Sequence, residues 1–303
     1  MKSSNIGGQA VMEGVMMRNA DKYAVAVRKT DGEIVVKTEE YKGIVQNKKI
    51  RSLPIIRGVF SFIDSMVLGM STLTYSASFF MDEEEEEKDE KKESVMMGLT
   101  IACSVVMAVA IFMILPYFLS QLFRKFTDST TLITLLEGAV RLVIFFGYIL
   151  LISRMKDIQR VFMYHGAEHK CINCIEHGME LNVENVLKSS RLHKRCGTSF
   201  LFIVMIVSII FFLFIRIESP IWRVVFRLLL IPVIAGVSFE FIRLAGKSEN
   251  KLVILLSKPG MMLQKLTTRE PDASMAEVAI ASVEAVFDWR AYLKENFWWQ
   301  EKV

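Results

Sequence analysis

Most of the histidines and cysteines of this chain lie in one short stretch. The chain has 303 residues but only four histidines and four cysteines, and two of each fall between Tyr164 and Cys174. The other two histidines and one more cysteine follow soon after, at His177, His193 and Cys196. Imidazole nitrogens and thiolate sulfurs are preferred ligands of zinc and similar divalent transition metals. The clustering therefore predicts a metal site in the middle of the chain.

The spacing within the stretch indicates which of these groups can act together. In an α-helix each residue turns by about 100°, so His165, Glu168 and His169 share one face, whereas Cys171 and Cys174 lie on the far side. One helix therefore cannot direct both histidines and both cysteines at a single metal. The order His-x-x-Glu-His is that of the inverted zinc peptidases, in which the glutamate acts on water at the metal. We expect His165 and His169 to be metal ligands and Glu168 to be the general base.

Other segments must complete the ligand set. His193 and Cys196 offer an imidazole and a thiolate three residues apart, and Glu240 is expected near the same membrane face. Either source would give a catalytic site with three protein ligands and an open position. If Cys174, His193 and Cys196 instead join one histidine, the site is closed and structural. A third alternative is that the histidines only anchor a polar loop at the membrane surface.

A glycine-rich motif near the N-terminus has two interpretations. Residues 7–18 read GGQAVMEGVMMR, and Glu13 and Arg18 are their only charges. The functional hypothesis is a loop that folds back on the metal site, with Glu13 as ligand or base and Arg18 binding an anionic group. We favour the alternative, a strand and turn in which Glu13 and Arg18 pair. The motif would pack on the next segment, 23–41, whose alternating apolar and polar residues around Asp31-Gly32 are typical of a β-hairpin.

The composition is that of a membrane protein. Hydrophobic residues make up 52% of the chain and the mean hydropathy is +0.35, above the usual range of a soluble domain. The net charge of +4 gives no basis for a nucleic-acid partner. Four stretches approach the roughly 20 residues that a bilayer-spanning helix needs, namely residues 97–119, 131–152, 199–215 and 222–242. We expect a mainly α, polytopic membrane protein with a four-helix transmembrane bundle.

A fifth apolar stretch, residues 55–80, is long enough to span but contains Arg57 and Asp64. We expect it to be an interfacial or re-entrant amphipathic helix. Basic residues are concentrated between residues 153 and 198 and after residue 243, and the positive-inside rule places such segments in the cytoplasm. The N-terminus carries no secretory signal. We therefore expect a plasma-membrane protein whose termini and central loop are cytoplasmic.

These expectations divide the chain into seven segments. They are an N-terminal motif and β-hairpin (1–54), the interfacial helix (55–81), an acidic linker (82–94), transmembrane helices 1 and 2 (95–152), the cytosolic His/Cys loop (153–198), transmembrane helices 3 and 4 (199–243), and a C-terminal cap of cytosolic helices (244–303).

Charged residues inside two of the predicted spans suggest an ion pair. Glu137 lies about six residues into the second span and Arg227 about five into the fourth, so their depths are roughly 9 and 7.5 Å. An unpaired charge at that depth costs about 2.5–3.5 kcal/mol on insertion scales. We expect Glu137 and Arg227 to lie within about 4 Å of each other, with Arg141 joining them and the cluster locking the bundle.

Four motifs together resemble a known family. They are residues 7–18, YHGAEHKCINC at 164–174, HKRCGTSF at 193–200 and KPGMMLQKLTTREP at 258–271. From residue 7 to about 285 the chain resembles the bacterial YqhQ family, multi-pass membrane proteins of unknown function described as predicted metal-dependent enzymes. The resemblance implies a shared polar set of His165, Glu168, His169, His193 and Cys196. Cys171 and His177 depart from the family pattern.

Two functional hypotheses follow. The first is a membrane-embedded, metal-dependent hydrolase acting at the cytoplasmic face, with Zn²⁺ or another divalent transition metal as cofactor. The second is a scaffold without catalytic activity, whose structural zinc site rigidifies a cytosolic surface for a membrane-protein partner or a second copy of the chain. In either case the lipid bilayer is a partner. The sequence names no substrate.

Overall fold

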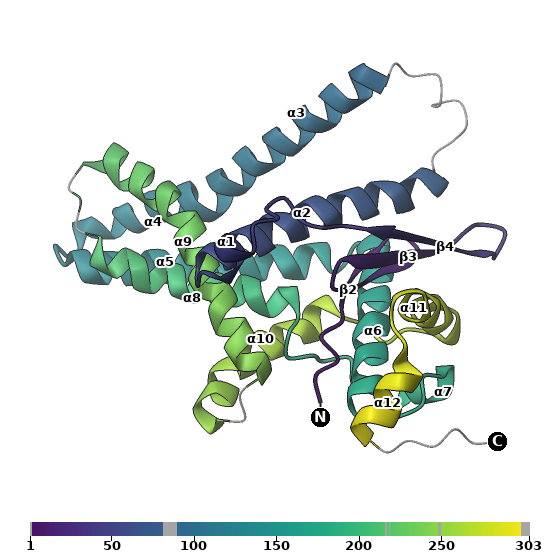
Figure 1. The fold of residues 1–303 in the computed structure, drawn as a ribbon. Coiled ribbons are helices and arrows are strands. Elements are labelled where there is room, and N and C mark those ends of the chain that lie inside the picture. Colours follow the sequence, from purple (N-terminus) through teal and green to yellow (C-terminus); the bar gives the residue numbers. More distant parts are fainter. Residues whose placement is uncertain (1, 81–89, 216, 218, 248–249, 298–303) are drawn as a thin grey trace. The chain divides into compact units, whose positions relative to one another are not determined.

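The computed structural model describes residues 2–80, 90–215, 217, 219–247 and 250–297. The described chain is mainly helical, with a small antiparallel sheet at the N-terminus (Figure 1). Most of the predicted acidic linker, residues 82–89, lies outside the described residues. The chain divides into two units. Unit 1 comprises Met1–Phe80, Ser153–Phe202 and Ala235–Val303, and unit 2 comprises Met81–Ile152 and Ile203–Ile234.

The sheet of unit 1 is a four-stranded meander in the order β1-β2-β3-β4. Its strands are β1 (Gly7–Val11), β2 (Gly14–Asn19), β3 (Lys22–Arg28) and β4 (Ile34–Glu40). The last two form the hairpin expected around Asp31-Gly32, and Gly32 adopts a φ of 90° in the turn. Residues 7–18 form a second hairpin on its edge, in which Val11 pairs with Gly14 across the turn Met12-Glu13.

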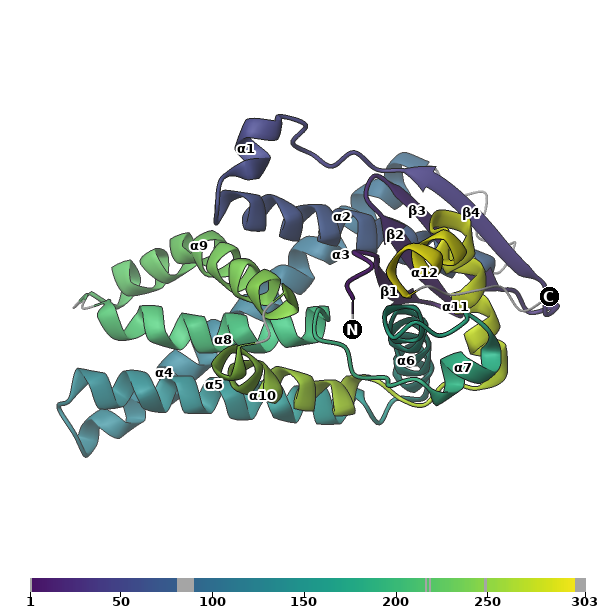
Figure 2. The ribbon, with the colours of Figure 1, turned by 60° about the horizontal axis from the view of Figure 1, so that its bottom comes forward.

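Helices cover both faces of the sheet. Successive side chains of a strand point to opposite faces, and here both sets are apolar. One face packs on α6 (Lys156–Glu176) and α11 (Ala273–Val286) through Val15, Met17, Ala24 and Ala26 (Figures 1 and 2). The other face packs on α2 (Ile56–Ala77) through Val11, Met16, Val25 and Val27, with Leu68 as the buried contribution of the helix. The sheet therefore brings the N-terminal motif against α6.

The rest of unit 1 is helical. Its remaining elements are α1 (Lys48–Ser52), the 3₁₀ turn η1 (Ser78–Phe80), α7 (Val183–Lys188), α10 (Lys251–Thr267) and α12 (Trp289–Phe297). The C-terminal helices expected within residues 244–303 are α10, α11 and α12. Asp272 begins α11 by accepting a hydrogen bond from the N–H of Met275, as an N-cap residue does.

Unit 2 consists of apolar helices. It contains α3 (Glu90–Val109), a π-helical turn η3 (Ala110–Ile114), α4 (Leu115–Gln121), the 3₁₀ turn η4 (Leu122–Lys125), α5 (Thr130–Ile152), and parts of α8 (Gly197–Phe214) and α9 (Pro220–Lys247). Among the described residues, five helical segments are long and apolar enough to cross a membrane: Ile56–Phe80, Gly98–Lys125, Thr130–Ile152, Gly197–Phe214 and Ile221–Gly246. The last four correspond to the spans expected from the sequence.

Three charged residues of unit 2 meet in its interior. Arg227 donates to Glu137 at 2.6 Å and Arg141 donates to the same carboxylate at 2.8 Å. Both distances are within the 4 Å limit set from the sequence. The two guanidinium groups lie over the ring of Phe212, at 4.7 Å for Arg227 and 5.0 Å for Arg141. Arg141 also donates to the hydroxyl of Ser208 at 2.9 Å.

The ambiguous apolar segment forms α2, which contacts the sheet along one side. Asp64, only 2% exposed, accepts hydrogen bonds from the hydroxyl of Tyr41 at 3.1 Å and the N–H of Ile44 at 2.8 Å. Ser76, near the other end of the helix, accepts from the N–H of Met12 at 3.0 Å. One side of α2 is thus polar and covered by the sheet, unlike the surface of a helix surrounded by lipid. The length and composition of α2 would nevertheless suffice for a span.

Candidate metal centre

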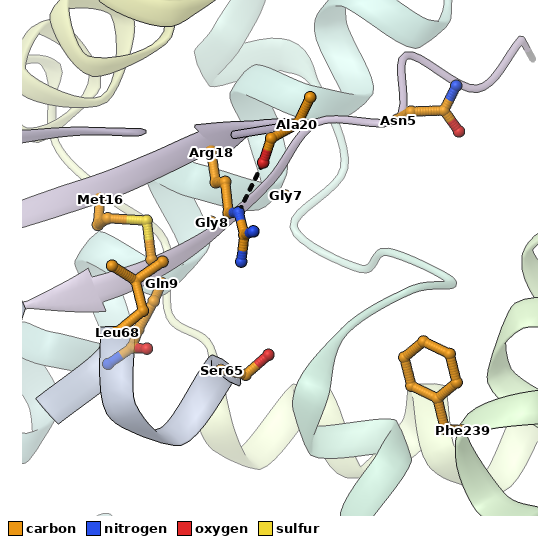
Figure 3. Close-up of a pocket in the computed structure, with 10 residues that line it drawn as sticks. All are labelled: Asn5, Gly7, Gly8, Gln9, Met16, Arg18, Ala20, Ser65, Leu68 and Phe239. Carbon is orange, nitrogen blue, oxygen red and sulfur yellow. Dashed lines mark hydrogen bonds between the residues drawn. The ribbon is translucent and has the colours of Figure 1, made fainter. Parts of the chain in front are cut away.

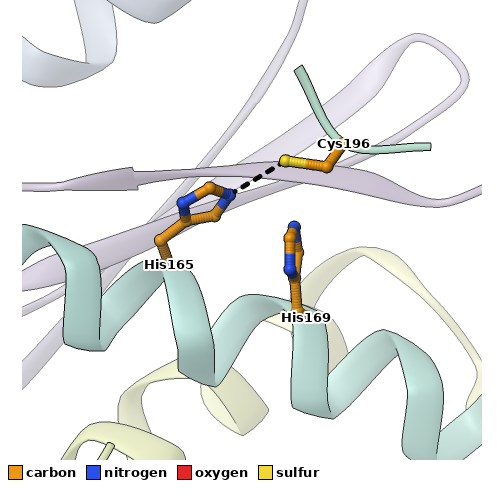
Figure 4. Close-up of side chains that lie close together, drawn as sticks. All are labelled: His165, His169 and Cys196. Carbon is orange, nitrogen blue, oxygen red and sulfur yellow. Dashed lines mark hydrogen bonds between the residues drawn. The ribbon is translucent and has the colours of Figure 1, made fainter. Parts of the chain in front are cut away.

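Two histidines and one cysteine converge in unit 1. His165 and His169 project from one side of α6 because they are four residues apart, and their ring centroids lie 4.4 Å from each other. Cys196 immediately precedes α8 and approaches the imidazoles from the other side (Figure 4). One potential ligand atom from each of the three residues lies within 4.8 Å of the others. This is the ligand set that the described residues offer for a metal ion.

Both imidazoles use the same nitrogen, Nδ1, for a hydrogen bond to the backbone. The Nδ1 atom of His165 lies 2.9 Å from the carbonyl oxygen of Thr267, and that of His169 lies 2.6 Å from the carbonyl oxygen of Arg191. A carbonyl oxygen only accepts, so each Nδ1 donates to it, and Nε2 is the ring nitrogen that remains to bind a metal. Metal-ligating histidines usually donate their other N–H in this way. The two carbonyls thus orient both rings as ligands.

The sulfur of Cys196 completes the set. It lies 3.3 Å from the Nε2 atom of His165 and accepts a hydrogen bond from the N–H of Thr198 at 3.3 Å. Its place at the start of α8 exposes it to the unpaired N–H groups and the positive end of the helix dipole. Two imidazole nitrogens and a thiolate suit Zn²⁺ or a similar divalent transition metal. The residues present therefore fit the cofactor expected from the sequence.

Glu168 lies beside these ligands and is only 5% exposed. Burial raises the pKa of its carboxyl group to about 7, although the charge of His165 and a hydrogen bond from the N–H of Gly8 act in the opposite direction. Gly8 permits this approach because it has no side chain. A Cβ atom there would lie 2.9 Å from Cγ of Glu168 and 2.6 Å from the carbonyl oxygen of Met16. The N-terminal motif thus reaches the site through its second glycine, and not through Glu13, the residue of the functional hypothesis.

The centre opens onto a cleft of about 590 Å³. His165, Glu168 and Cys196 line it, whereas His169 does not. The remaining walls come from β1, α2, the start of α8 and the C-terminal part of α9, and include Ala10, Phe62, Phe200, Leu201, Phe239 and Ile242. Two of the three potential ligands, His165 and Cys196, therefore have an accessible side, and Glu168 is on it.

His193 was expected to be a ligand, but the structure places it in a neighbouring polar cluster. Its Nε2 atom lies 3.4 Å from a carboxylate oxygen of Glu176, and its ring centroid is 5.8 Å from that of His169. Glu176 is fully buried and also accepts from Arg195 and from the N–H and hydroxyl of Ser4. The acidic partner, which the spacing of His193 and Cys196 did not reveal, explains why His193 turns away from the metal ligands.

Two other candidates, Glu240 and Cys174, also have different partners. Glu240 forms an ion pair with Arg57 of α2 and accepts from the N–H of Ile55 at 3.3 Å. Cys174 is buried in the core, with its thiol 3.3 Å from the carbonyl oxygen of Glu180. Cys171 is completely buried in the same core, on the side of α6 that the helical periodicity assigned to it. None of the three belongs to the ligand set found among the described residues.

The expected pairing of Glu13 with Arg18 is not formed. Glu13 instead pairs with Arg160 and accepts from the hydroxyl of Tyr164 at 3.3 Å. Arg18 donates to the carbonyl oxygen of Ala20 at 2.8 Å and stacks on the ring of Tyr41 at 5.3 Å. The turn separates the two residues, because Glu13 is in the loop between β1 and β2, whereas Arg18 is opposite Gly7. Arg18 lines a second hollow, of about 470 Å³ (Figure 3).

Comparisons with known proteins agree with the family suggested by the motifs. A family model described as "Protein of unknown function (DUF1385)" matches residues 53–289. The "Uncharacterized protein YqhQ" of Bacillus subtilis (strain 168) is 36% identical over 301 residues, covering 96% of this chain and 94% of that protein. The chain belongs to this family. No solved structure matches it. The family match includes all three potential ligands and Glu168, whereas the sheet precedes its first residue.

Proposed function

We propose that this member of the YqhQ family is a metal-dependent hydrolase that acts at the cytoplasmic face of the plasma membrane. The observation that carries the proposal is the combination of three convergent ligands with an open side, where Glu168 lines the same cleft. Catalytic zinc sites keep three protein ligands and one open position, whereas structural sites are closed by a fourth. Cys174 and His193, the residues that could have closed the site, have other partners.

Each residue of the centre has a distinct role in this proposal. When bound, the metal supplies Lewis-acid activation of water and of the substrate carbonyl. Glu168 takes the proton from the attacking water and gives it to the leaving group. The carbonyls of Thr267 and Arg191 hold the two imidazoles so that each presents Nε2. His165, His169 and Cys196 hold the cofactor, for which Zn²⁺ or another divalent transition metal is suitable.

We also propose four membrane spans, formed by α3 to α4, α5, α8 and α9. The support comes from the packing of unit 1, in which α6 and α11 cover the N-terminal sheet. Elements that pack together must be on the same side of a membrane, so an even number of spans separates the sheet from α6. A full span by α2 would make that number three. An interfacial α2 would satisfy the condition, and the basic residues of the loop favour a cytoplasmic location for this side.

Hydrolysis by purified protein tests the function. The full chain in detergent or nanodiscs would be loaded with Zn²⁺ and incubated with a panel of fluorogenic peptides and esters, with and without a chelator. We expect hydrolysis that the chelator abolishes and that Glu168→Gln reduces while the bound metal is retained. Hydrolysis that is indifferent to both treatments would contradict the proposal, as would a Zn²⁺-loaded protein inactive on every substrate class.

A further inference from the structure

Strand β1 has one edge that no other strand of the described residues covers. Among these residues it pairs only with β2, and Val11 and Gly14 form the hydrogen-bonded pair that closes the two-residue turn. Hydrogen-bonded and non-hydrogen-bonded pairs alternate along an antiparallel ladder. Gly7, Gln9 and Val11 therefore direct their backbone groups towards β2. Gly8 and Ala10 direct theirs away from the sheet.

This free edge runs along the metal centre. Gly8 lies directly against Glu168, since a Cβ atom added to this glycine would be 2.9 Å from Cγ of Glu168. Ala10, two residues further, is about 7 Å away along the strand, and it lines the same cleft as Glu168, His165 and Cys196. Among the described residues, none hydrogen-bonds to the outward N–H or C=O of Ala10. The cleft thus contains an unpaired segment of strand next to the proposed general base.

The other walls of the cleft are strongly apolar. Phe62 of α2 and Phe200 of α8 are in contact, with ring centroids 5.5 Å apart, and Leu201, Phe239 and Ile242 extend the same kind of surface. The one guanidinium group in the lining, that of Arg195, is held by Glu176. The cleft therefore offers backbone hydrogen bonds on the side of β1 and apolar contact elsewhere.

We propose that the substrate is an extended polypeptide segment with apolar side chains, which adds as a strand to the free edge of β1. In this binding mode main-chain hydrogen bonds give affinity, and alternate side chains enter pockets that give specificity. A lipid acyl chain would fill the apolar walls but leave the backbone of Ala10 unpaired. The inference rests on the proposed hydrolase function and assigns its substrate class.

The reaction is then peptide-bond hydrolysis. Gly8 is the residue of β1 next to Glu168. A substrate carbonyl that pairs near Ala10 is therefore only one or two strand residues away from the position of Glu168. The oxygen of water bonds to the carbonyl carbon, and Glu168 accepts the proton released. The C–N bond breaks, and the same proton passes to the departing amine. The products are a peptide with a new carboxylate and a peptide with a new amino group, so water is the only co-reactant.

Two proline variants test the edge. Proline removes one backbone N–H and is tolerated on edge strands where that N–H points outward. Ala10→Pro removes the N–H that faces the cleft. Thr38→Pro is the matched control, because the register makes the N–H of Thr38 point outward from β4, the opposite edge of the sheet. Binding of a labelled peptide of alternating leucine and serine would be measured by fluorescence anisotropy on metal-free protein, so that cleavage does not interfere.

We expect Ala10→Pro to weaken peptide binding by roughly tenfold, as the loss of one or two backbone hydrogen bonds does, and Thr38→Pro to leave it unchanged. Circular dichroism of both variants shows whether the sheet is intact. Equal affinity of the wild-type protein and a folded Ala10→Pro variant would overturn the inference.

A second measurement leaves the protein unaltered. A series of the same peptide, N-methylated at one position at a time, should lose affinity for the wild-type chain at alternate positions only, because alternate N–H groups of a strand face its partner. No loss at any position would contradict strand addition. Displacement of the peptide by phosphatidylglycerol vesicles, with every N-methylated analogue bound equally, would identify a lipid site instead.

The failure of this inference can be distinguished from the failure of the proposed function. Chelator-sensitive ester hydrolysis without any peptide binding would refute this inference alone. Inactivity on every substrate class would refute the proposed function. Peptide binding to the metal-free protein would still test whether a peptide adds as a strand to the edge of β1.

Discussion

The Nε2 atom of His165 and the Sγ atom of Cys196 lie 3.3 Å apart, although 31 positions separate the two residues in the chain. Each is held there by the backbone: the carbonyl of Thr267 fixes the imidazole, and the N–H of Thr198 donates to the sulfur. His169 is oriented in the same way from a third segment, by the carbonyl of Arg191. Such preorganisation from separate segments is what a metal ligand set requires.

The first prediction concerns metal content. Purified protein should bind about one Zn²⁺ per chain, and His165→Ala combined with His169→Ala should remove it, because one thiolate alone leaves too few ligands. Cys196→Ser should weaken binding by removing the thiolate. His177→Ala is the control, since His177 ends α6 and hydrogen-bonds to the carbonyl oxygen of Asn173 at 2.7 Å, outside the ligand set. Elemental analysis that finds the double variant as metal-rich as the parent would place the metal elsewhere.

The second prediction separates catalysis from metal binding. Glu168→Gln preserves the shape of the side chain but cannot accept the proton, so the turnover rate should fall by about 10²–10⁴, the usual contribution of a general base. Zn²⁺ content and thermal stability should stay close to those of the parent. Glu184→Gln is the control, because Glu184 is exposed and pairs with Lys188 on α7. If the Glu168→Gln variant complemented a deletion strain fully, Glu168 would not be the general base.

The sequence was most informative where local periodicity decides the geometry. The spacing of His165 and His169 places them together on any α-helix, and the same rule assigns Cys171 and Cys174 to the far side, where the structure buries them in the core. The four long apolar helices and the hairpin around Asp31-Gly32 follow from equally local patterns. The contact between Glu137 and Arg227 was predicted from the depth of each residue along its own helix alone.

Partners chosen by tertiary packing could not be found in this way. His193 is three residues from Cys196, but its ring faces Glu176, because that buried carboxylate needs donors. Glu13 pairs with Arg160 rather than Arg18 because the β-turn directs it towards α6. The role of Gly8 depends on the position of β1 against α6, which a glycine-rich motif suggests only in general terms.

The third prediction tests the number of spans. Single cysteines would be introduced into a chain without its native cysteines and labelled with an impermeant maleimide in intact cells. Four spans place Lys29→Cys in the β3–β4 turn and Lys188→Cys at the end of α7 on the cytoplasmic side, so both should be protected. Phe126→Cys, between α4 and α5, should be labelled. A labelled Lys29→Cys with a protected Lys188→Cys would show that α2 crosses the membrane.

The fourth prediction concerns acid stability. Burial raises the pKa of Glu176, but the hydrogen bond from His193, the charge of Arg195 and the N–H of Ser4 outweigh it, so the pKa is lowered below 4.5. A lowered pKa in the folded state means that the unfolded state binds the proton more tightly. The contribution of Glu176 to stability is therefore present above pH 4.5 and is lost as the pH falls through the folded-state pKa.

Thermal unfolding of the protein in detergent over a series of pH values measures this loss. Glu176→Gln should lower the melting temperature near neutral pH. As the pH is lowered, the melting temperature of this variant should fall less than that of the parent. Glu284→Gln is the control, because Glu284 is partly exposed and lies in an ion pair with Arg290. Parallel pH profiles for the parent and Glu176→Gln would show that this cluster does not control acid stability.

The last prediction concerns the ion-pair cluster of unit 2, in which one carboxylate serves two cations. Arg227 and Arg141 both donate to Glu137, and all three side chains are at most 5% exposed. Replacing either arginine by methionine leaves a paired carboxylate and arginine. Glu137→Gln instead leaves two buried cations over the same ring of Phe212 without a counter-ion. Breaking a buried pair by removing one partner costs about 3–5 kcal/mol.

We therefore expect Glu137→Gln to destabilise the folded protein by about 3–5 kcal/mol, and Arg227→Met or Arg141→Met to cost clearly less. Unfolding in mixed micelles with increasing denaturant measures all three on the same scale. The order follows from charge balance, because an arginine variant takes the cluster from a net charge of +1 to zero, whereas Glu137→Gln takes it to +2. Equal costs for the three variants, or a smaller cost for Glu137→Gln, would show that the cluster does not stabilise the helices through its charges.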